Sequence, residues 1–135
     1  MNLKLRNIPF SPPDMSEAEV QEVSEALRSG WITTGPRTKE FERQIAEYCH
    51  TDKAVCLNSA TACMELILRV LGVGPGDEVI VPAYTYIATA IAVLATGAIP
   101  IIADINETLT LDPKDFEAKI TPRTKAVIPV HIMGF

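Results

Sequence analysis

From Lys53 onward, short apolar segments alternate regularly with segments of helical periodicity. The apolar segments are 53–57, 77–82, 99–104 and 125–132. The helical segments lie between them, at 60–71, 86–97 and 112–120. Parallel strands joined by helical crossovers form a sheet that is buried on both faces, because each crossover places a helix against one face. We therefore predict an α/β fold with an open, mostly parallel sheet of these four strands, covered by helices on both sides.

Two further helices are predicted ahead of this alternating region. Ser16 and Glu19 form a capping-box pattern at the start of the first helix, and Gly30 is expected to end it. The apolar positions of the first helix recur at helical spacing: Val20, Val23 and Leu27. The second helix is expected from about Thr38 to Cys49. Its apolar face carries Phe41, Ile45 and Tyr48.

The length and charge of the chain exclude several classes of protein. At 135 residues it is long enough for one modest core, so a single domain is expected. The apolar content of 47% and the charged content of 21% are typical of globular proteins. A net charge of −5 gives no general attraction for nucleic acid or for anionic membranes. We expect neither as a partner.

The two ends of the chain carry expectations about location and completeness. The opening sequence, MNLKLRNIPFSPPDM, has no apolar stretch of signal-peptide length. The longest apolar run, around 87–94, is too short to span a bilayer, so a cytoplasmic protein without a membrane partner is expected. The sequence ends at HIMGF, directly after a predicted strand, where a parallel sheet needs a further crossover. The chain is therefore expected to be the front portion of something longer.

Three cysteines recur every seven residues, at Cys49, Cys56 and Cys63. They fall on a predicted helix, a predicted strand and another predicted helix, which favours buried small apolar side chains over metal ligands. His50 and His131 stand far apart in the sequence, without the spacing of metal ligands. No metal site is predicted.

Ligands in open α/β sheets collect beyond the carboxyl ends of the strands, so the loops from strand to helix are the candidate sites. In the first loop, LNSATACME, a helix is expected to begin about Ala60 with Thr61 in its first turn. Free N–H groups and the positive end of the helix dipole make such a terminus a phosphate cradle, to which the Thr61 hydroxyl adds a donor. Simple capping of the helix by Asn58 or Ser59 is the alternative.

The second loop is VPAYTYIAT, in which Thr85 is a candidate cap for a helix that begins near Tyr86. An aromatic ring in this place can stack on a planar cofactor that is held at the neighbouring phosphate site. Packing within the protein is the alternative role for Tyr84 and Tyr86. The third loop places Asp104 at a strand end, where we expect the carboxylate to cap the following turn rather than to be catalytic.

A glycine-rich stretch, LGVGPGDE, superficially looks like a nucleotide-binding fingerprint. It follows a predicted helix and precedes a predicted strand, which is the reverse of the order that phosphate cradling requires. Gly72, Gly74 and Gly76 are therefore expected to form a turn that ends the helix.

The only tryptophan lies in GWITTGP, a stretch that neither a helix nor a strand can continue. Trp31 there is either a packed loop residue or part of a ligand site. Trp31 by itself does not decide between these two roles, so the choice depends on the other motifs of the chain.

Four stretches occur in an order and at a spacing similar to one enzyme family. They are SGWITTGP (29–36), NSATA (58–62), GVGPGDEVIVPAYTYIATA (72–90) and ITPRTKAVIPVHIMG (120–134). Together they resemble the N-terminal part of the DegT/DnrJ/StrS-type sugar aminotransferases, and the resemblance covers almost the whole chain. These are pyridoxal-phosphate enzymes of the aspartate aminotransferase fold (fold type I), which transfer an amino group, usually from glutamate, to a keto group of a nucleotide-linked sugar.

The resemblance implies a three-layer αβα large domain and a site within it. It implies that 1–52 holds the N-terminal helices and a substrate-side loop, and that 53–135 begins the cofactor-binding domain. In the family the turn matching SATA binds the cofactor phosphate, which implies Thr61 and the backbone N–H of Ala62. The aromatic residue that follows a threonine stacks on the pyridine ring, which implies Tyr86.

The same resemblance implies how the substrate is bound and what this chain lacks. The GWITTGP loop lines the substrate side of a site shared between two subunits, so a homodimer is expected. The residues implied on the sugar side are Trp31, Thr33 and Thr34. The Schiff-base lysine of the family lies beyond Phe135, as does the acidic partner of the pyridine nitrogen, so no catalytic residue is assigned. None of the lysines here, such as Lys39, Lys53, Lys114, Lys119 and Lys125, occupies the matching motif.

The 135 residues by themselves are therefore expected to be inactive and to bind pyridoxal phosphate weakly or not at all. Two alternatives stay open. One is a non-catalytic α/β module that acts by self-association. The other is a pyridoxal-phosphate-dependent sugar dehydratase of the same fold.

Overall fold

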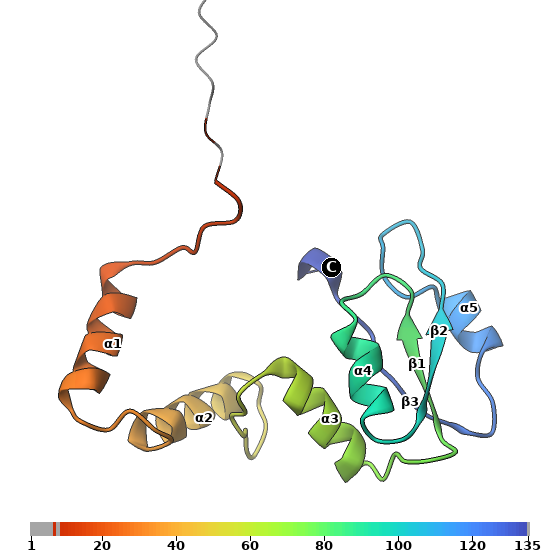
Figure 1. Cartoon of the computed structure of the whole chain (residues 1–135), viewed down its shortest axis with the longest axis horizontal. Helices are drawn as coiled ribbons and strands as arrows, with labels where there is room; N and C mark the ends of the chain where they lie inside the picture. The colour runs from red at the N-terminus through yellow and green to blue at the C-terminus, as the bar shows by residue number, and fades with distance from the viewer. Residues whose placement is uncertain (1–6, 8, 135) are drawn as a thin grey trace, which may run out of the picture. The chain divides into compact units, whose positions relative to one another are not determined.

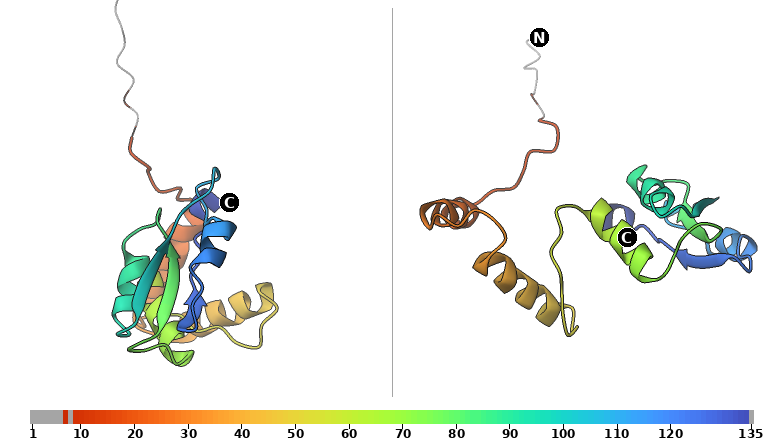
Figure 2. Two further views of the ribbon diagram at one scale, coloured as in Figure 1. Left: turned by 90° about the vertical axis from the view of Figure 1, so that its right-hand side faces the viewer. Right: turned by 60° about the horizontal axis from the view of Figure 1, so that its bottom comes forward.

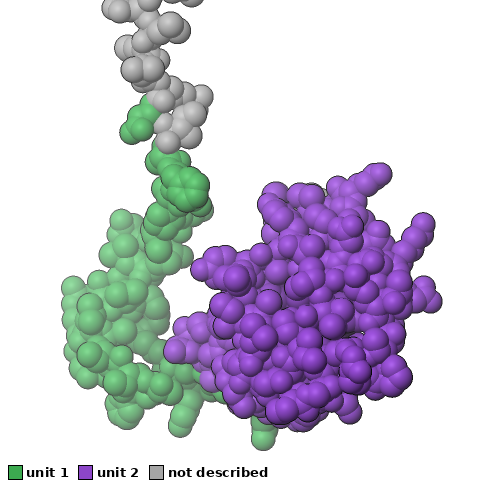
Figure 3. All heavy atoms as spheres, turned by 45° about the vertical axis from the view of Figure 1, so that its right-hand side comes forward, with its two compact units in different colours: residues 1–56 green, residues 57–135 purple. Residues whose placement is uncertain are grey.

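The computed structural model describes residues 7 and 9–134. The chain divides into two compact units, Met1–Cys56 and Leu57–Phe135, which Figure 3 shows in green and purple. No helix among the described residues has both the length and the apolar character needed to cross a membrane.

The first unit contains two helices, α1 (Glu17–Arg28) and α2 (Pro36–Tyr48). The capping box expected at the start of α1 is confirmed: the Ala18 N–H donates to Ser16 Oγ at 3.2 Å, and the Ser16 N–H donates to a Glu19 carboxylate oxygen at 2.6 Å. Gly30 has a positive φ of 74°, a left-handed conformation that glycine adopts without steric cost and that ends the first helix as predicted.

Helix α2 begins two residues earlier than expected, with Pro36 in its first turn. A proline suits this position because its missing N–H would be unpaired there anyway. Of the residues that the structure describes in this unit, only Gly35 and Ala46 are buried. The apolar faces predicted for the two helices exist but are exposed, so they form no core within the first unit.

The second unit is built on a three-stranded parallel sheet in the order β2-β1-β3. The strands are β1 (Glu78–Pro82), β2 (Ile99–Ala103) and β3 (Thr124–Val127). The helices are α3 (Ala60–Val70), α4 (Ala88–Leu94) and α5 (Pro113–Ala118), and a short 3-10 turn, η1 (Ile132–Gly134), follows β3. Both pairings of β1 are parallel, and Figure 1 labels the three strands. The prediction of a parallel α/β sheet is confirmed.

The core of the second unit lies between the central strand and two helices. Val79 and Val81 of β1 are fully buried and belong to one apolar cluster with Leu68 of α3 and Val93 of α4. Ile80 points to the opposite face of the sheet, because side chains alternate along a strand, and it is buried as well. In Figure 2 (left), α4 lies on one side of the strands and α5 on the other. The result is the three-layer arrangement predicted from the sequence.

The strand predicted at 53–57 is wrong. This segment has no strand structure and pairs with none of the three strands. The Cys56 N–H donates instead to the carboxylate of Glu42 on α2, at 2.9 Å. An apolar segment becomes a strand only where a neighbouring chain offers its backbone groups, and within the described residues nothing does so here. The predicted sheet of four strands is therefore a sheet of three.

Several element boundaries also differ from the prediction. The strand predicted at 125–132 is shorter, since β3 ends at Val127 and 132–134 form a 3-10 turn. Helix α4 begins at Ala88 rather than near Tyr86, and its N-cap is Ile87 instead of Thr85. The glycine-rich stretch behaves as expected: α3 ends at Val70, and Gly72 and Gly76 have positive φ values of 75° and 92° in the turn before β1. Positive φ values favour glycine, so this stretch forms the helix-ending turn that was predicted.

The cysteines are only partly as predicted. Cys49 is exposed rather than buried, because it follows the last residue of α2 and no core surrounds that end. Cys56 and Cys63 are half-buried, and only Cys63 lies in a regular element, helix α3. All three are free thiols.

A buried carboxylate ties the start of β1 to the segment that leads into β3. Glu78 is 2% exposed; Thr121 Oγ1 donates to one of its oxygens at 2.5 Å, and Arg123 Nε donates to the other at 2.9 Å. These hydrogen bonds, first from Thr121 and then from Arg123, lower the pKa of Glu78 below the ordinary value for glutamate. The main chain adds a bond from the Glu78 N–H to the Arg123 carbonyl at 2.9 Å.

We expect Glu78→Gln to lower the stability of the second unit and to remove part of its sensitivity to acid. Because the folded pKa of Glu78 is lowered, its ionised form stabilises the fold above the unfolded-state pKa of about 4.3, and this contribution is lost as the pH falls through the folded pKa. Urea unfolding followed by circular dichroism, from about pH 7 to about pH 3, measures both effects. Glu107→Gln in the exposed loop after β2 is the control. Equal urea midpoints for wild type and Glu78→Gln at neutral pH would contradict this role.

Candidate functional site

The N-terminus of α3 is the first candidate site, and Ser59 already accepts one of its free N–H groups. Ser59 is the N-cap: its Oγ accepts the Ala62 N–H at 3.1 Å, while its carbonyl accepts the Cys63 N–H at 3.1 Å. The alternative that Ser59 caps the helix is thus confirmed. Thr61 lies half-buried in the first turn. A ligand that used the Ala62 N–H would therefore replace a serine hydroxyl, which is an exchange of one acceptor for another.

The loop that leaves β1 presents two tyrosines. Tyr86 is 81% exposed and Tyr84 is 49% exposed, so packing within this chain does not account for the ring of Tyr86. The backbone beneath the ring is held, because the Tyr86 carbonyl accepts the Thr89 N–H at 3.1 Å and Thr85 Oγ1 lies 2.8 Å from Thr89 Oγ1. The loop offers an open aromatic face on a fixed support.

The first two loops reach the same edge of the sheet. Helix α4 connects two parallel neighbours, β1 and β2, so it runs antiparallel to them, and α3 packs beside α4 before the chain enters β1. Figure 1 shows both helices descending while the arrow of β1 rises. Thr61 at the start of α3 and Tyr86 ahead of α4 therefore both lie toward the carboxyl edge of β1. Donors for an anion and a flat apolar ring occur together at this edge.

Asp104 follows β2, and its carboxylate serves the loop around it. Its Oδ1 accepts the N–H of Ile105 at 2.8 Å, and its own N–H donates to a carboxylate oxygen of Asp115 at 2.6 Å. The Asp104 carboxylate thus bonds its immediate neighbour. The following turn is capped by Asn106, whose side-chain oxygen accepts the Thr108 N–H at 2.9 Å, so the capping role expected for Asp104 is wrong. Among residues 7 and 9–134, no group of three or more His, Cys, Asp or Glu side chains could hold a metal ion.

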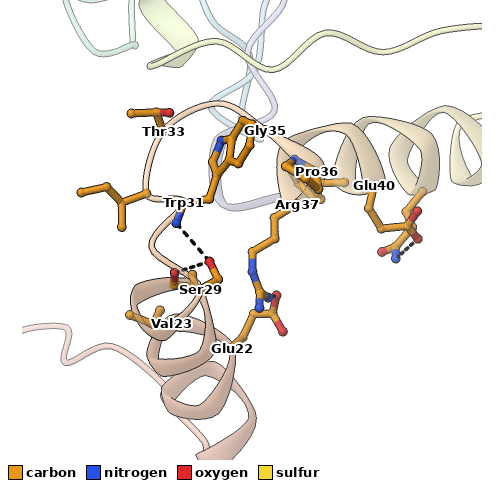
Figure 4. Close-up of a pocket in the computed structure, with 13 residues that line it drawn as sticks. Glu22, Val23, Ser29, Trp31, Thr33, Gly35, Pro36, Arg37 and Glu40 are labelled. Carbon is orange, nitrogen blue, oxygen red and sulfur yellow. Dashed lines mark hydrogen bonds and ion pairs between the residues drawn. The ribbon is translucent and has the colours of Figure 1, made fainter.

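The loop between α1 and α2 forms the second candidate site, within the first unit. Trp31 is 57% exposed, its backbone N–H donates to Ser29 Oγ at 3.1 Å, and its indole N–H donates to the Thr34 carbonyl at 3.1 Å. The ring lies over Gly35, as Figure 4 shows. Trp31 and Thr33 line a groove of about 1140 Å³ between the two helices, whereas Thr34 contributes only its carbonyl to the tryptophan.

Charged side chains in this groove neutralise one another. Arg37 forms an ion pair with Glu22 and lies 3.6 Å from a carboxylate oxygen of Glu25. Glu40 pairs with Arg43 at 2.8 Å, and hydrogen bonds from Arg43 and then from Gln44 lower the pKa of Glu40 to about 2. A groove with paired charges and an indole wall suits a neutral ligand with an apolar face and hydroxyl groups better than a highly charged one.

The predicted site residues therefore fall into two groups, each in its own unit. The edge of the sheet carries Thr61, Ala62 and Tyr86, and the loop of the first unit carries Trp31, Thr33 and Thr34. Sequence reasoning missed the roles of Gly35 and Arg37 in shaping the groove. The signal for Gly35 was present, since a glycine directly before a helix-starting proline leaves room for a neighbouring ring.

Comparison with known proteins gives a consistent family. The sequence model of the DegT/DnrJ/EryC1/StrS aminotransferase family matches residues 13–135. The chain is 48% identical over 128 residues to SpsC, a spore coat polysaccharide biosynthesis protein of Bacillus subtilis strain 168. That match covers 94% of this chain and 33% of SpsC.

Solved structures resemble the chain closely. Spr1654 of Streptococcus pneumoniae, named as a sugar aminotransferase and solved in PLP, PMP and apo forms, has a TM-score of 0.89 and 58% identity, over 96% of this chain and 33% of its own. NtdA of Bacillus subtilis with bound PMP has a TM-score of 0.86 and 39% identity, over 98% of this chain and 32% of its own. These likenesses confirm the predicted transferase fold. The chain spans about a third of the length of these relatives.

We expect Gly35→Ala to displace the indole of Trp31. A Cβ at this position would overlap the indole nitrogen and approach the Cδ1 atom of the ring to 2.7 Å. The ring would lose its bond to the Thr34 carbonyl and become more exposed. Since Trp31 is the only tryptophan, its fluorescence reports this directly as a red shift and as stronger quenching by acrylamide. Gly74→Ala is the matched control, because an added Cβ there meets nothing within 4 Å. Unchanged emission in Gly35→Ala would refute this packing.

Proposed function

Because the chain belongs to the DegT/DnrJ/EryC1/StrS aminotransferase family, we propose that it is the N-terminal part of a pyridoxal-phosphate-dependent sugar aminotransferase. The substrate in this proposal is a nucleotide-linked keto-sugar, the amino donor is glutamate, and the pathway is amino-sugar or polysaccharide biosynthesis. One observation carries it furthest: the start of α3 and the exposed ring of Tyr86 lie at the same edge of a parallel sheet.

The residues at this edge suit the chemistry of the cofactor. The phosphate would accept hydrogen bonds from the Thr61 hydroxyl and from first-turn N–H groups of α3, including that of Ala62, where the helix dipole favours negative charge. Tyr86 would cover one face of the ring and exclude water from it. When bound, pyridoxal phosphate supplies an electron sink for the carbon that carries the amino group. The contribution of these residues is to bind and orient.

The loop between α1 and α2 is proposed to contact the sugar. The indole of Trp31 offers an apolar face, and the Thr33 hydroxyl at the groove wall can donate to or accept from sugar hydroxyls. Thr34 is proposed to act through the shape of the loop, since its carbonyl holds the indole. The paired charges of the groove leave recognition of a neutral sugar ring to these groups.

A homodimer and a cytoplasmic location complete the proposal. The exposed apolar residues of α1 and α2, among them Val23, Leu27 and Phe41, form surface that a soluble protein covers with other protein. A second subunit that completes a shared site would cover part of it. Three free thiols without a disulfide suit a reducing compartment.

Tyr86→Leu is expected to weaken pyridoxal phosphate binding about two- to tenfold, because the stacking of an aromatic ring contributes roughly 0.5–1.5 kcal/mol beyond burial. Tyr84→Leu, two residues earlier in the same loop and less exposed, is the matched control and should bind like the wild type. Titration of the cofactor into the complete gene product, followed by absorbance, measures both. A stronger loss in Tyr84→Leu than in Tyr86→Leu would contradict the assigned stacking residue.

The 135 residues by themselves are expected to show no transaminase turnover, since we assign no catalytic lysine among them. The test combines this chain with glutamate, pyridoxal phosphate and a keto-sugar nucleotide, and follows formation of the amino sugar by mass spectrometry. The complete gene product under the same conditions is the positive control. Amino-sugar formation by the short chain would show that the proposal misplaces the chemistry.

A further inference from the structure

Helix α4 carries a polar side chain on its buried face. Thr89 is 5% exposed and shares this face with Ala92 and Val93, which are buried as well. Residues four positions apart lie on the same side of a helix, so Thr89 faces the interior of the second unit as Val93 does. Valine has nearly the same shape as threonine and would fill this position without a polar atom. The hydroxyl of Thr89 therefore needs an explanation other than packing.

The hydroxyl of Thr89 pairs with a second hydroxyl, which lies outside the helix. Thr89 Oγ1 is 2.8 Å from Oγ1 of Thr85, a half-buried residue that precedes α4. Capping of α4 is not the purpose of this pair, because the N-cap is Ile87, whose apolar side chain accepts no hydrogen bond. The two hydroxyls join the buried face of α4 to the loop that leaves β1.

Two hydrogen bonds meet at the carbonyl of Tyr86, between these threonines. The carbonyl accepts the Thr89 N–H at 3.1 Å and, more weakly, the hydroxyl of Thr85 at 3.5 Å. A hydroxyl has one proton, so a Thr85 hydroxyl that donates to Tyr86 accepts the proton of the Thr89 hydroxyl. The backbone of Tyr86 is thus linked to Thr89 twice, once through the main chain and once through the two side chains.

The ring of Tyr86 depends on this backbone for its direction. The side chain is 81% exposed, and the rotamers open to a side chain are set by the backbone from which it leaves. A backbone that is tied to a buried residue presents the ring in a restricted orientation before a ligand binds. Such preorganisation increases affinity, because less conformational freedom is lost on binding.

We propose that Thr89 is a positioning residue for the cofactor, and that it acts through Thr85 and the backbone of Tyr86 to orient the stacking ring. This inference rests on the proposed function, in which Tyr86 covers one face of pyridoxal phosphate. Thr89 is buried beneath the loop and acts on the cofactor only through the tyrosine. Its contribution to affinity therefore disappears when the ring is removed, whereas a general effect on the fold would persist.

Thr89→Val removes the hydroxyl and keeps the shape of the side chain. We expect the complete gene product with this change to bind pyridoxal phosphate about two- to fivefold more weakly, the effect of losing one hydrogen bond. The apo form should unfold at nearly the wild-type temperature, because valine fills the same space. Thr89→Ser keeps the hydroxyl and should restore most of the affinity. Titration of the cofactor, followed by absorbance, measures all three proteins.

The same change in the Tyr86→Leu background shows whether the tyrosine carries the effect. We expect Thr89→Val to cause no further loss of affinity there, since residues that act through one contact are not additive. Equal losses in the two backgrounds would overturn the proposal. Equal losses in Thr89→Val and Thr89→Ser, with Tyr86 in place, would do so as well.

Thr96→Val, just beyond the other end of α4, is the matched control. Thr96 is 7% exposed and its hydroxyl donates to the Val93 carbonyl at 2.7 Å, so this change also removes a buried hydroxyl. It should lower the unfolding temperature of the apo form and leave the affinity for pyridoxal phosphate unchanged. A loss of affinity as large as that of Thr89→Val would contradict a specific role for Thr89.

Hydrogen exchange of the apo form provides a readout without the cofactor. The amides of 83–89 should exchange faster in Thr89→Val than in the wild type or in Thr96→Val, because the loop has lost one of its two links to Thr89. Unchanged exchange in this segment would show that the hydroxyl pair does not hold the loop.

The outcomes separate this inference from the function on which it rests. If Tyr86→Leu weakens binding while Thr89→Val binds like the wild type, the inference is wrong and the proposed function stands. If the wild-type gene product takes up no pyridoxal phosphate, both fail.

Discussion

The second unit depends on the burial of β1 between two parallel partners. Every residue of this strand is buried, and the side chains on both faces are apolar from Val79 to Val81. Burial on both faces requires helices on both faces, and parallel neighbours require those helices to run back against the strands. The loops that precede the helices are consequently gathered at one edge. The position of the candidate site follows from this arrangement rather than from any single loop.

Strand β1 is held by side-chain hydrogen bonds at its start and loses its pairing with β3 at its end. At its start, the ionised Glu78 is held by Thr121 and Arg123, so β1 and the approach to β3 are joined through side chains as well as backbone. At its end, Pro82 withholds the donor that would continue the pairing. A strand that is fixed at its start and unpaired at its end suits a binding site, because the groups around a ligand are then held in place before the ligand binds.

The first unit differs from the second in the interactions that stabilise it. Helix α1 has a capping box and α2 carries ion pairs such as Arg43 with Glu40, yet the apolar faces of both helices are exposed. Surface ion pairs contribute little to stability, so these helices need apolar contacts with other protein to be firmly held. The chain spans about a third of the length of its relatives, and the unpaired segment 53–57 likewise lacks a neighbouring strand among the described residues.

The sequence by itself determined the features that depend on neighbours along the chain. The capping box of Ser16, the turn at Gly72 and the strands β1, β2 and β3 were predicted, as was a helix starting at Ala60, because caps, turns and apolar periodicity act over a few residues. The motifs also identified the family and, through it, the candidate residues. Only the tertiary structure decided that 53–57 forms no strand, that Ser59 occupies the Ala62 N–H and that β1 parts from β3 at Pro82. Each of these depends on which backbone group a distant segment offers, and local sequence carries no record of that.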